Sequence, residues 1–252
     1  MLLFVLLARA EAPAPAMVTT VRGNVTLVEA GARKPAPTPP FLLPAGASLD
    51  VAAGGHVVLL RQGGAFTIDG PKTVDAEALR PATATADAVG DLLARKTSLA
   101  SAGASRAAGF QMTRPVPGEK LLTFEEVRWR CDACGPQKVE LVDMRTGSAA
   151  WTKDGEGSVR YDGERLRPGP WVAKIGGREF SFVVASDDDR MAFARSLDAA
   201  NLETVKDPAD TAQLAVGLHL LAGYPTDALV IAERKKDAAL VAEIEKRYNL
   251  AP

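Results

Sequence analysis

The chain has 252 residues, of which 47% are apolar and 24% charged, a composition typical of folded proteins. This length favours two or three small modules over a single large core. A formal net charge of -1, from 30 basic and 31 acidic residues, gives no support to nucleic-acid binding, which requires a concentrated basic face.

The first ten residues, MLLFVLLARA, form a short apolar run that ends on Ala8, Arg9 and Ala10. Small residues around one variable residue are typical of signal-peptide cleavage sites, although no basic residue precedes this run. We therefore expect residues 1–16 to be a signal peptide and an extended N-terminus, and the protein to be periplasmic or secreted. A buried first strand of a cytosolic protein is the alternative. No later apolar segment reaches the length of a bilayer span, so we expect no membrane span after the leader.

Residues 17–80 show short alternating segments without a helical period, which favours a small antiparallel β-sandwich or barrel. Val21, Val25 and Leu27 lie on one face of a predicted first strand, in which Gly23 marks a bulge or close approach, and the proline-rich residues 31–40 predict a loop. Further on, residues 56–61 and 65–69 predict a hairpin, because the intervening glycines supply the positive φ of tight turns.

This stretch resembles the periplasmic FecR-type domain, in which glycine turns alternate with short apolar strands. The positions that carry the resemblance are Gly46, Leu49, Gly54, Val58, Leu60, Gly64, Ile68 and Gly70. Members of that family relay signals through a membrane-spanning segment to a cytoplasmic anti-sigma region. We find neither in this sequence, so the resemblance implies the periplasmic module alone.

Residues 81–118 are rich in alanine, serine and threonine and predict a helical connector, with Val89, Leu92, Leu93 and Leu99 at helical intervals. Residues 119–186 then return to alternation and predict an immunoglobulin- or fibronectin-like β-sandwich. Its last hairpin is expected around Gly176 and Gly177, with Trp171 opposite the phenylalanines that follow.

Aromatic residues of this second sandwich are the candidate binding residues. Buried core anchors are the first interpretation of its tryptophans. The alternative is an exposed aromatic row that binds carbohydrate or peptidoglycan, formed by Trp151, Tyr161 and Trp171.

Residues 187–252 predict an α-helical, tetratricopeptide-like unit. Asp187, Asp188 and Asp189 suit a helix N-terminus and lack the spacing of a calcium loop. Asp207 and Pro208 predict a capped helix start, and Gly223 a helix end. A single helical pair rarely buries its own apolar face, so we expect this unit to pack on the β-sandwich or on a partner.

Cys131 and Cys134 are the only cysteines. A thioredoxin-like redox pair would need a helix after the first cysteine, and Gly135 and Pro136 oppose one. A zinc site needs more ligands than the sequence offers nearby, and haem attachment needs histidine in place of Gly135. A structural disulfide in an oxidising compartment is the preferred interpretation, and free thiols are the alternative.

Catalytic chemistry finds little support in the sequence. Ser148, Ser158 and Ser181 lack a nucleophile-elbow pattern, and the two histidines, His56 and His219, fall in a predicted strand and a leucine-rich helix. The carboxylates Glu125, Glu126, Asp143, Asp154 and Glu156 form no distinct acid and base pair. We predict no catalytic, cofactor-binding or metal-binding residues. A hydrolase would require a polar cleft that joins a histidine to carboxylates of another module.

Taken together, the sequence predicts a mainly β multidomain protein with a C-terminal α-helical unit. We expect a non-enzymatic, exported scaffold or interaction protein of the bacterial envelope, without cofactor, that binds one or more protein partners. The alternatives are a carbohydrate- or peptidoglycan-binding module and a periplasmic sensor component of FecR-type signalling.

Overall fold

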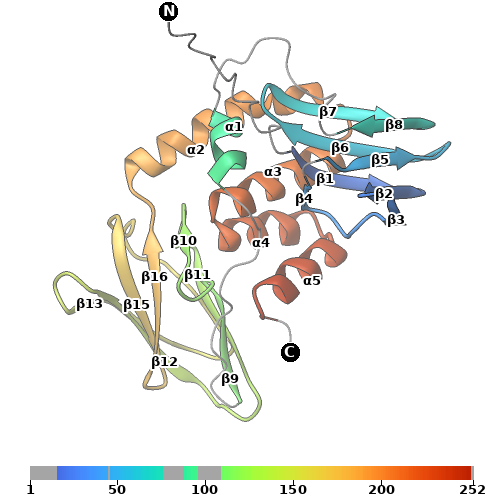
Figure 1. Ribbon diagram of the computed structural model, residues 1–252. Helices are drawn as coiled ribbons and strands as arrows, with labels where there is room; N and C mark the ends of the chain where they lie inside the picture. The colour runs from blue at the N-terminus through green and yellow to red at the C-terminus, as the bar shows by residue number, and fades with distance from the viewer. Residues whose placement is uncertain (1–15, 45, 76–87, 96–108, 251–252) are drawn as a thin grey trace, which may run out of the picture.

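The computed structural model describes residues 16–44, 46–75, 88–95 and 109–250. Two β-sandwiches lie on either side of a group of helices (Figure 1). The predicted fold class, a β multidomain protein with a C-terminal helical unit, is confirmed. The predicted leader lies outside the described residues except for Ala16, and so does much of the predicted connector, including Leu99.

The first sandwich consists of two antiparallel sheets with the strand orders β4-β1-β6-β7 and β3-β2-β5-β8. Its strands are β1 (Ala16–Arg22), β2 (Val25–Glu29), β3 (Ala32–Pro35), β4 (Phe41–Leu43), β5 (Ser48–Val51), β6 (His56–Arg61), β7 (Gly64–Asp69) and β8 (Lys72–Asp75). Val18, Leu49 and Leu59 fill the space between the sheets and are fully buried.

The turn glycines of the first sandwich agree with the sequence only in part, because Gly23, expected as a bulge within one strand, instead separates β1 from β2. The hairpin of β6 and β7 is formed, and its two-residue loop is Gln62 and Gly63, one residue earlier than expected. Gly63 has φ +88°, a conformation that glycine adopts without steric cost. A side chain at Gly70 would collide with the backbone of Ala52, so only glycine fits this corner.

The expected proline-rich loop is partly wrong, because its first half forms β3, which pairs with β2. Pro35 lies opposite Thr26 in this ladder. A proline is tolerated there because β3 is an edge strand, whose outer side needs no hydrogen-bond donors.

The second sandwich has one sheet with the order β10-β16-β15-β12-β13 and a smaller sheet with the order β14-β11-β9. Its strands are β9 (Phe110–Arg114), β10 (Lys120–Leu121), β11 (Glu126–Cys131), β12 (Gln137–Asp143), β13 (Ser148–Gly155), β14 (Ser158–Arg160), β15 (Gly169–Ile175) and β16 (Arg178–Val184). Trp129, Trp171 and Phe182 lie between the two sheets and are 1–3% exposed.

Strand β9 falls within residues 81–118, where the sequence predicts a helical connector, and it pairs with β11 instead. All five of its residues are buried. Phe110 and Met112 face the sandwich core, whereas Gln111 donates a hydrogen bond to the carbonyl of Asn249 near the C-terminus. Its sequence, FQMTR, alternates apolar and polar residues as a strand does, a local signal that the prediction of a helical connector missed.

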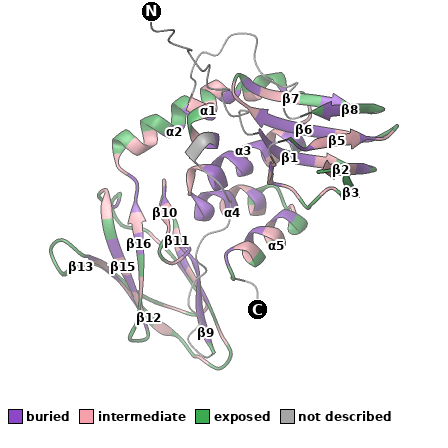
Figure 2. Ribbon diagram, viewed as in Figure 1, coloured by how far each residue is buried: buried purple, intermediate pink, exposed green. Residues whose placement is uncertain are grey.

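The helices are α1 (Ala88–Arg95), α2 (Asp187–Ala200), the short 3-10 helix η1 (Leu202–Thr204), α3 (Pro208–Ala222), α4 (Pro225–Arg234) and α5 (Ala238–Arg247). The predicted caps are formed: Asp207 accepts a hydrogen bond from the Ala209 amide, and Gly223 has φ +84°. Figure 2 shows that α3 and α4 are largely buried. Within the described residues, none of these helices is both long and apolar enough to cross a bilayer.

Helix α3 lies at the centre of the molecule. Leu214, Leu218 and Leu221 pack on the outer face of β1 and β6, where they meet Met17, Val58 and Leu60. Val216 and Leu220 point the other way, toward α4 and α5. The helical unit thus packs on the first sandwich, and because it covers the outer sheet face, β1 and β6 are buried on both sides.

Candidate functional site

A cavity of about 610 Å³ opens between the second sandwich and helices α2 and α3. Small-molecule sites commonly have volumes of about 300–1,000 Å³ and often lie between domains. The sandwich contributes the segment after β10, the segment after β14 and the end of β16 to its wall. The cavity therefore has the size and position of a binding site.

Aromatic rings form much of the wall. Phe124 stacks on the core residue Phe182 at 5.3 Å between ring centroids and meets Tyr161 edge-on at 5.1 Å. On the helical side, Phe193 of α2 contacts the ring of His219 edge-on at 4.5 Å. These ring contacts pack the wall from both sides.

Charged groups at the cavity are mostly cationic. Arg160, Arg165 and Arg190 line it, against the single carboxylate of Glu125. That carboxylate already accepts two hydrogen bonds from Arg234, at 2.7 and 2.8 Å. The lining therefore carries an excess of positive charge.

The three arginines differ in how many of their hydrogen-bond donors are already used within the protein. Arg190 donates to the carbonyl of Leu122 at 3.2 and 3.1 Å and to Asp187 at 2.9 Å. Arg165 reaches the same, exposed Asp187 only at 3.4 Å. Arg160 forms no ion pair with any residue that the structure describes. Arg160 and Arg165 thus keep most of their hydrogen-bond donors for a ligand.

His219 completes the wall in a defined tautomer. Its Nδ1 lies 2.7 Å from the carbonyl oxygen of Ala215, which can only accept, so Nδ1 carries the proton. Burial lowers the pKa of His219, and neither that carbonyl nor the charge of Asp227 reverses the shift. The imidazole is therefore neutral, and its Nε2 is an acceptor without a hydrogen-bond partner among the residues that the structure describes.

Asp227 holds the sandwich side of the cavity in place. It is 7% exposed and accepts hydrogen bonds from the amide of Leu122 at 2.8 Å and from the amide and hydroxyl of Thr123 at 3.3 and 3.1 Å. Burial raises its pKa, and these hydrogen bonds offset part of the rise. The neighbouring Thr226 accepts the amide of Val116 at 2.9 Å, so the first turn of α4 anchors the segment around β10.

A second polar cluster lies between the first sandwich and α3. His56 of β6 is hydrogen-bonded to Asp69 at 2.7 Å and to the buried Asp210 at 2.8 Å. Arg22 of β1 donates to Asp210 at 2.6 Å and to Asp207 at 2.8 Å. Desolvation opposes protonation of His56, but the two carboxylates outweigh it and raise its pKa.

This second cluster partly meets the condition set above for a hydrolase, because Asp210 belongs to another module than His56. Both ring nitrogens are nevertheless hydrogen-bonded to carboxylates, so both must carry protons. An imidazolium in this state has no free nitrogen with which to act as a base. The contact therefore serves to join the first sandwich to α3.

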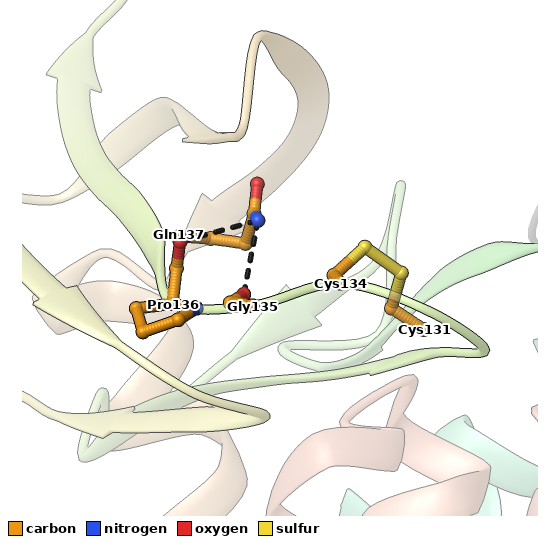
Figure 3. Close-up of a disulfide and its surroundings, with 5 residues drawn as sticks. All are labelled: Cys131, Cys134, Gly135, Pro136 and Gln137. Carbon is orange, nitrogen blue, oxygen red and sulfur yellow. Dashed lines mark hydrogen bonds between the residues drawn. A yellow bond between two sulfur atoms is a disulfide. The ribbon is translucent and has the colours of Figure 1, made fainter.

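Cys131 and Cys134 lie at disulfide-bonding distance, with their Cα atoms 5.6 Å apart (Figure 3). The pair closes the connection between β11 and β12, and Gln137 donates hydrogen bonds to the carbonyls of Gly135 and Pro136 beside it. The connection contains no helix, as the sequence predicts.

The three candidate aromatic residues do not lie in one exposed row. Trp171 is 3% exposed and belongs to the core. Trp151 and Tyr161 are half-buried at the sandwich edge, 5.3 Å apart and edge to face, and the indole of Trp151 donates to Asp162. Tyr161 alone of the three lines the cavity.

The acidic triplet forms the first turn of α2, at the helix N-terminus, as the sequence predicts. Ser186 and Asp189 form a reciprocal capping box. Among the residues that the structure describes, no three histidine, cysteine, aspartate or glutamate side groups gather as a metal site would require.

Sequence reasoning missed Arg160, Arg165 and Arg190 as site residues. One local signal was present, because Arg160 and Arg165 flank Tyr161 within the segment RYDGER. Arginine and tyrosine are both enriched where proteins bind partners. No local signal links this segment to Phe193 or His219, which only the fold brings near.

No family model, curated protein or solved structure matches this protein. The resemblance of residues 43–71 to the FecR-type domain stays a prediction.

Proposed function

We propose that this protein is an exported, non-enzymatic interaction protein of the bacterial envelope, built on a FecR-like first sandwich. The cavity between the second sandwich and α2 receives part of its protein partner. The observation that carries this proposal is the chemistry of the cavity wall, where aromatic rings stand beside incompletely paired arginines. Tyrosine and arginine in such settings supply much of the binding energy at protein interfaces.

Fixed joints between the modules support a scaffold role. The Asp210 contacts tie α3 to the first sandwich, and Asp227 ties α4 to the second. Glu233 of α4 also pairs with Arg114 and Arg128 of the second sandwich at 2.9 and 3.0 Å. A partner seated at the junction would therefore meet a preorganised surface, which lowers the entropic cost of binding.

Peptidoglycan is the alternative ligand, and the exposure of Tyr161 to the cavity favours it. Co-sedimentation of the full-length protein with purified peptidoglycan tests this option, with Tyr161→Ala expected to remain in the supernatant. Equal sedimentation of the original protein and the variant would show that Tyr161 is not part of the binding surface.

The main proposal is tested in the envelope itself. A photoreactive benzoylphenylalanine placed at Glu164, an exposed residue between Gly163 and Arg165 of the cavity wall, should form a cross-link to a specific partner. The matched control carries the same group at the exposed Lys235 of α4's C-terminus and should not. Intact-mass analysis of the same material should show loss of the leader and of two hydrogens. A cytosolic, uncleaved and reduced product, or identical cross-links from both positions, would refute the proposal.

A further inference from the structure

The junction cavity also indicates the chemistry of its ligand. We propose that it binds an apolar group that carries a free carboxylate and, next to it, a hydrogen-bond donor. The C-terminal residue of a polypeptide and a free apolar acid are the two sources of this chemistry. The biological setting of this ligand rests on the proposed function, whereas the chemistry of the ligand rests only on the lining of the cavity.

An apolar body fits because two opposed walls present rings and aliphatic groups. Phe124, Tyr161 and Leu166 come from the sandwich, and Phe193 and Leu197 come from α2. Leu166 is 4% exposed and Phe193 5% exposed, so both already belong to packed cores and cannot fold into the space. An apolar ligand group would remove the remaining accessible surface of these walls from water.

An anion fits because the arginines at the cavity exceed the carboxylates available to them. Asp187 is shared by Arg165 and Arg190, and Glu125 is taken by Arg234. Arg160 is left without a carboxylate among the described residues. A planar carboxylate matches the paired donors of a guanidinium group, which makes bidentate contacts of this kind strong and directional.

A hydrogen-bond donor on the ligand fits the remaining polar group of the wall. The neutral His219 presents Nε2 as an acceptor, because Nδ1 donates to Ala215. A peptide amide or a hydroxyl beside the apolar group could supply the proton. An apolar C-terminal residue combines all three features, namely an apolar side group, a terminal carboxylate and an amide N–H.

The first experiment uses anilinonaphthalene sulfonate, a fluorescent aromatic anion, as the probe for the full-length protein. We expect saturable one-to-one binding, and weaker binding of the neutral phenylnaphthylamine, which has the same aromatic body. Arg160→Gln and Arg165→Gln should each weaken binding of the anion by about tenfold, the loss expected for one hydrogen bond to a charged group. They should leave binding of the neutral probe unchanged.

Two further variants keep this test independent of folding. Arg167→Gln removes the same charge from the same loop, but Arg167 does not line the cavity, so binding should persist. Ala194→Trp places a large ring at an exposed position of α2 on the cavity wall and should abolish binding of both probes. Thermal unfolding should be similar for all variants. Unchanged anion affinity in Arg160→Gln and Arg165→Gln, or an equal loss in Arg167→Gln, would overturn the proposal.

A displacement experiment then separates the two sources of the carboxylate. Acetyl-Leu-Phe with a free C-terminus, its C-terminal amide and phenylpropionate each compete with the bound fluorophore. Displacement by the peptide acid but not by its amide assigns the site to the C-terminus of a polypeptide, and displacement by phenylpropionate alone assigns it to free acids. If neither acid displaces the fluorophore, the ligand chemistry is wrong, whereas a cross-link from Glu164 would still support the proposed function.

Discussion

Nε2 of His56 lies 2.8 Å from Oδ2 of Asp210, which joins β6 of the first sandwich to the first turn of α3. Asp210 is 1% exposed and also accepts a hydrogen bond from Arg22. A buried carboxylate with two cationic partners forms a strong joint between modules, because each partner offsets its desolvation.

This joint should weaken at alkaline pH. The folded protein raises the pKa of His56 above its ordinary value of 6.5, so stability from this group is complete below 6.5. As the pH rises from there through the raised pKa, the unfolded protein loses its proton first and this stability is lost. Asp69, Asp207, Asp210 and Arg22 are the charged groups that surround the imidazole.

The variant His56→Gln should remove this pH dependence and lower the free energy of unfolding at pH below 6.5 by about 1.5–3 kcal/mol, the range for hydrogen bonds to charged groups. Denaturant unfolding across the pH range measures both effects. His219, whose pKa is lowered, contributes a slope of opposite sign to the free energy of unfolding against pH, and does so below pH 6.5. The two histidines therefore act in separate pH ranges. A slope above 6.5 that persists in His56→Gln would contradict the assignment.

Removal of the Asp227 carboxylate should loosen the second sandwich from α4. Asp227→Ala leaves the amides of Leu122 and Thr123 without their acceptor, which should lower the free energy of unfolding by about 2–4 kcal/mol. The control Asp154→Ala, at an exposed position of β13, should change it by less than about 0.5 kcal/mol. Equal effects of the two variants would mean that the buried acceptor contributes nothing.

The disulfide should contribute modest stability because it closes a short loop. For a loop of this length, the polymer-entropy estimate is about 2 kcal/mol, so Cys131→Ser with Cys134→Ser should fold with a lowered melting temperature. Addition of a reductant to the original protein should reproduce this shift and leave the double variant unaffected. A reductant effect on the double variant would point to another cause.

Helix α3 packs against β1 through a glycine. A Cβ atom at Gly217 would lie 2.9 Å from the terminal methyl of Met17 and 3.0 Å from the methyl of Thr19. Gly217→Leu should therefore destabilise the fold by about 1–3 kcal/mol through overpacking. The control Ala239→Leu, at an exposed position of α5, should be nearly neutral, and equal thermal stability of both variants would refute the close packing.

Local signals explain most of the elements that were predicted correctly. Asp207 and Pro208 start α3, Gly223 ends it, and the glycines after β6 turn the backbone into β7. Each signal acts on residues within one turn of itself, so it can be recognised without knowledge of the fold. The candidate site could not be recognised from local signals in this way. Its arginines were missed, although Tyr161, which lies between Arg160 and Arg165, was singled out.

The sequence by itself indicated where many of the strands and helices lie, because caps, turns and periodicity depend on neighbouring residues. Only the tertiary structure decided that β1 and β6 are buried on both faces, that β9 pairs with β11, and that Arg160 and His219 line one cavity. Those outcomes depend on contacts between distant segments, such as the one between Leu122 and Asp227, 105 residues apart. Such contacts form only when the modules pack, and no local pattern encodes which surfaces then meet.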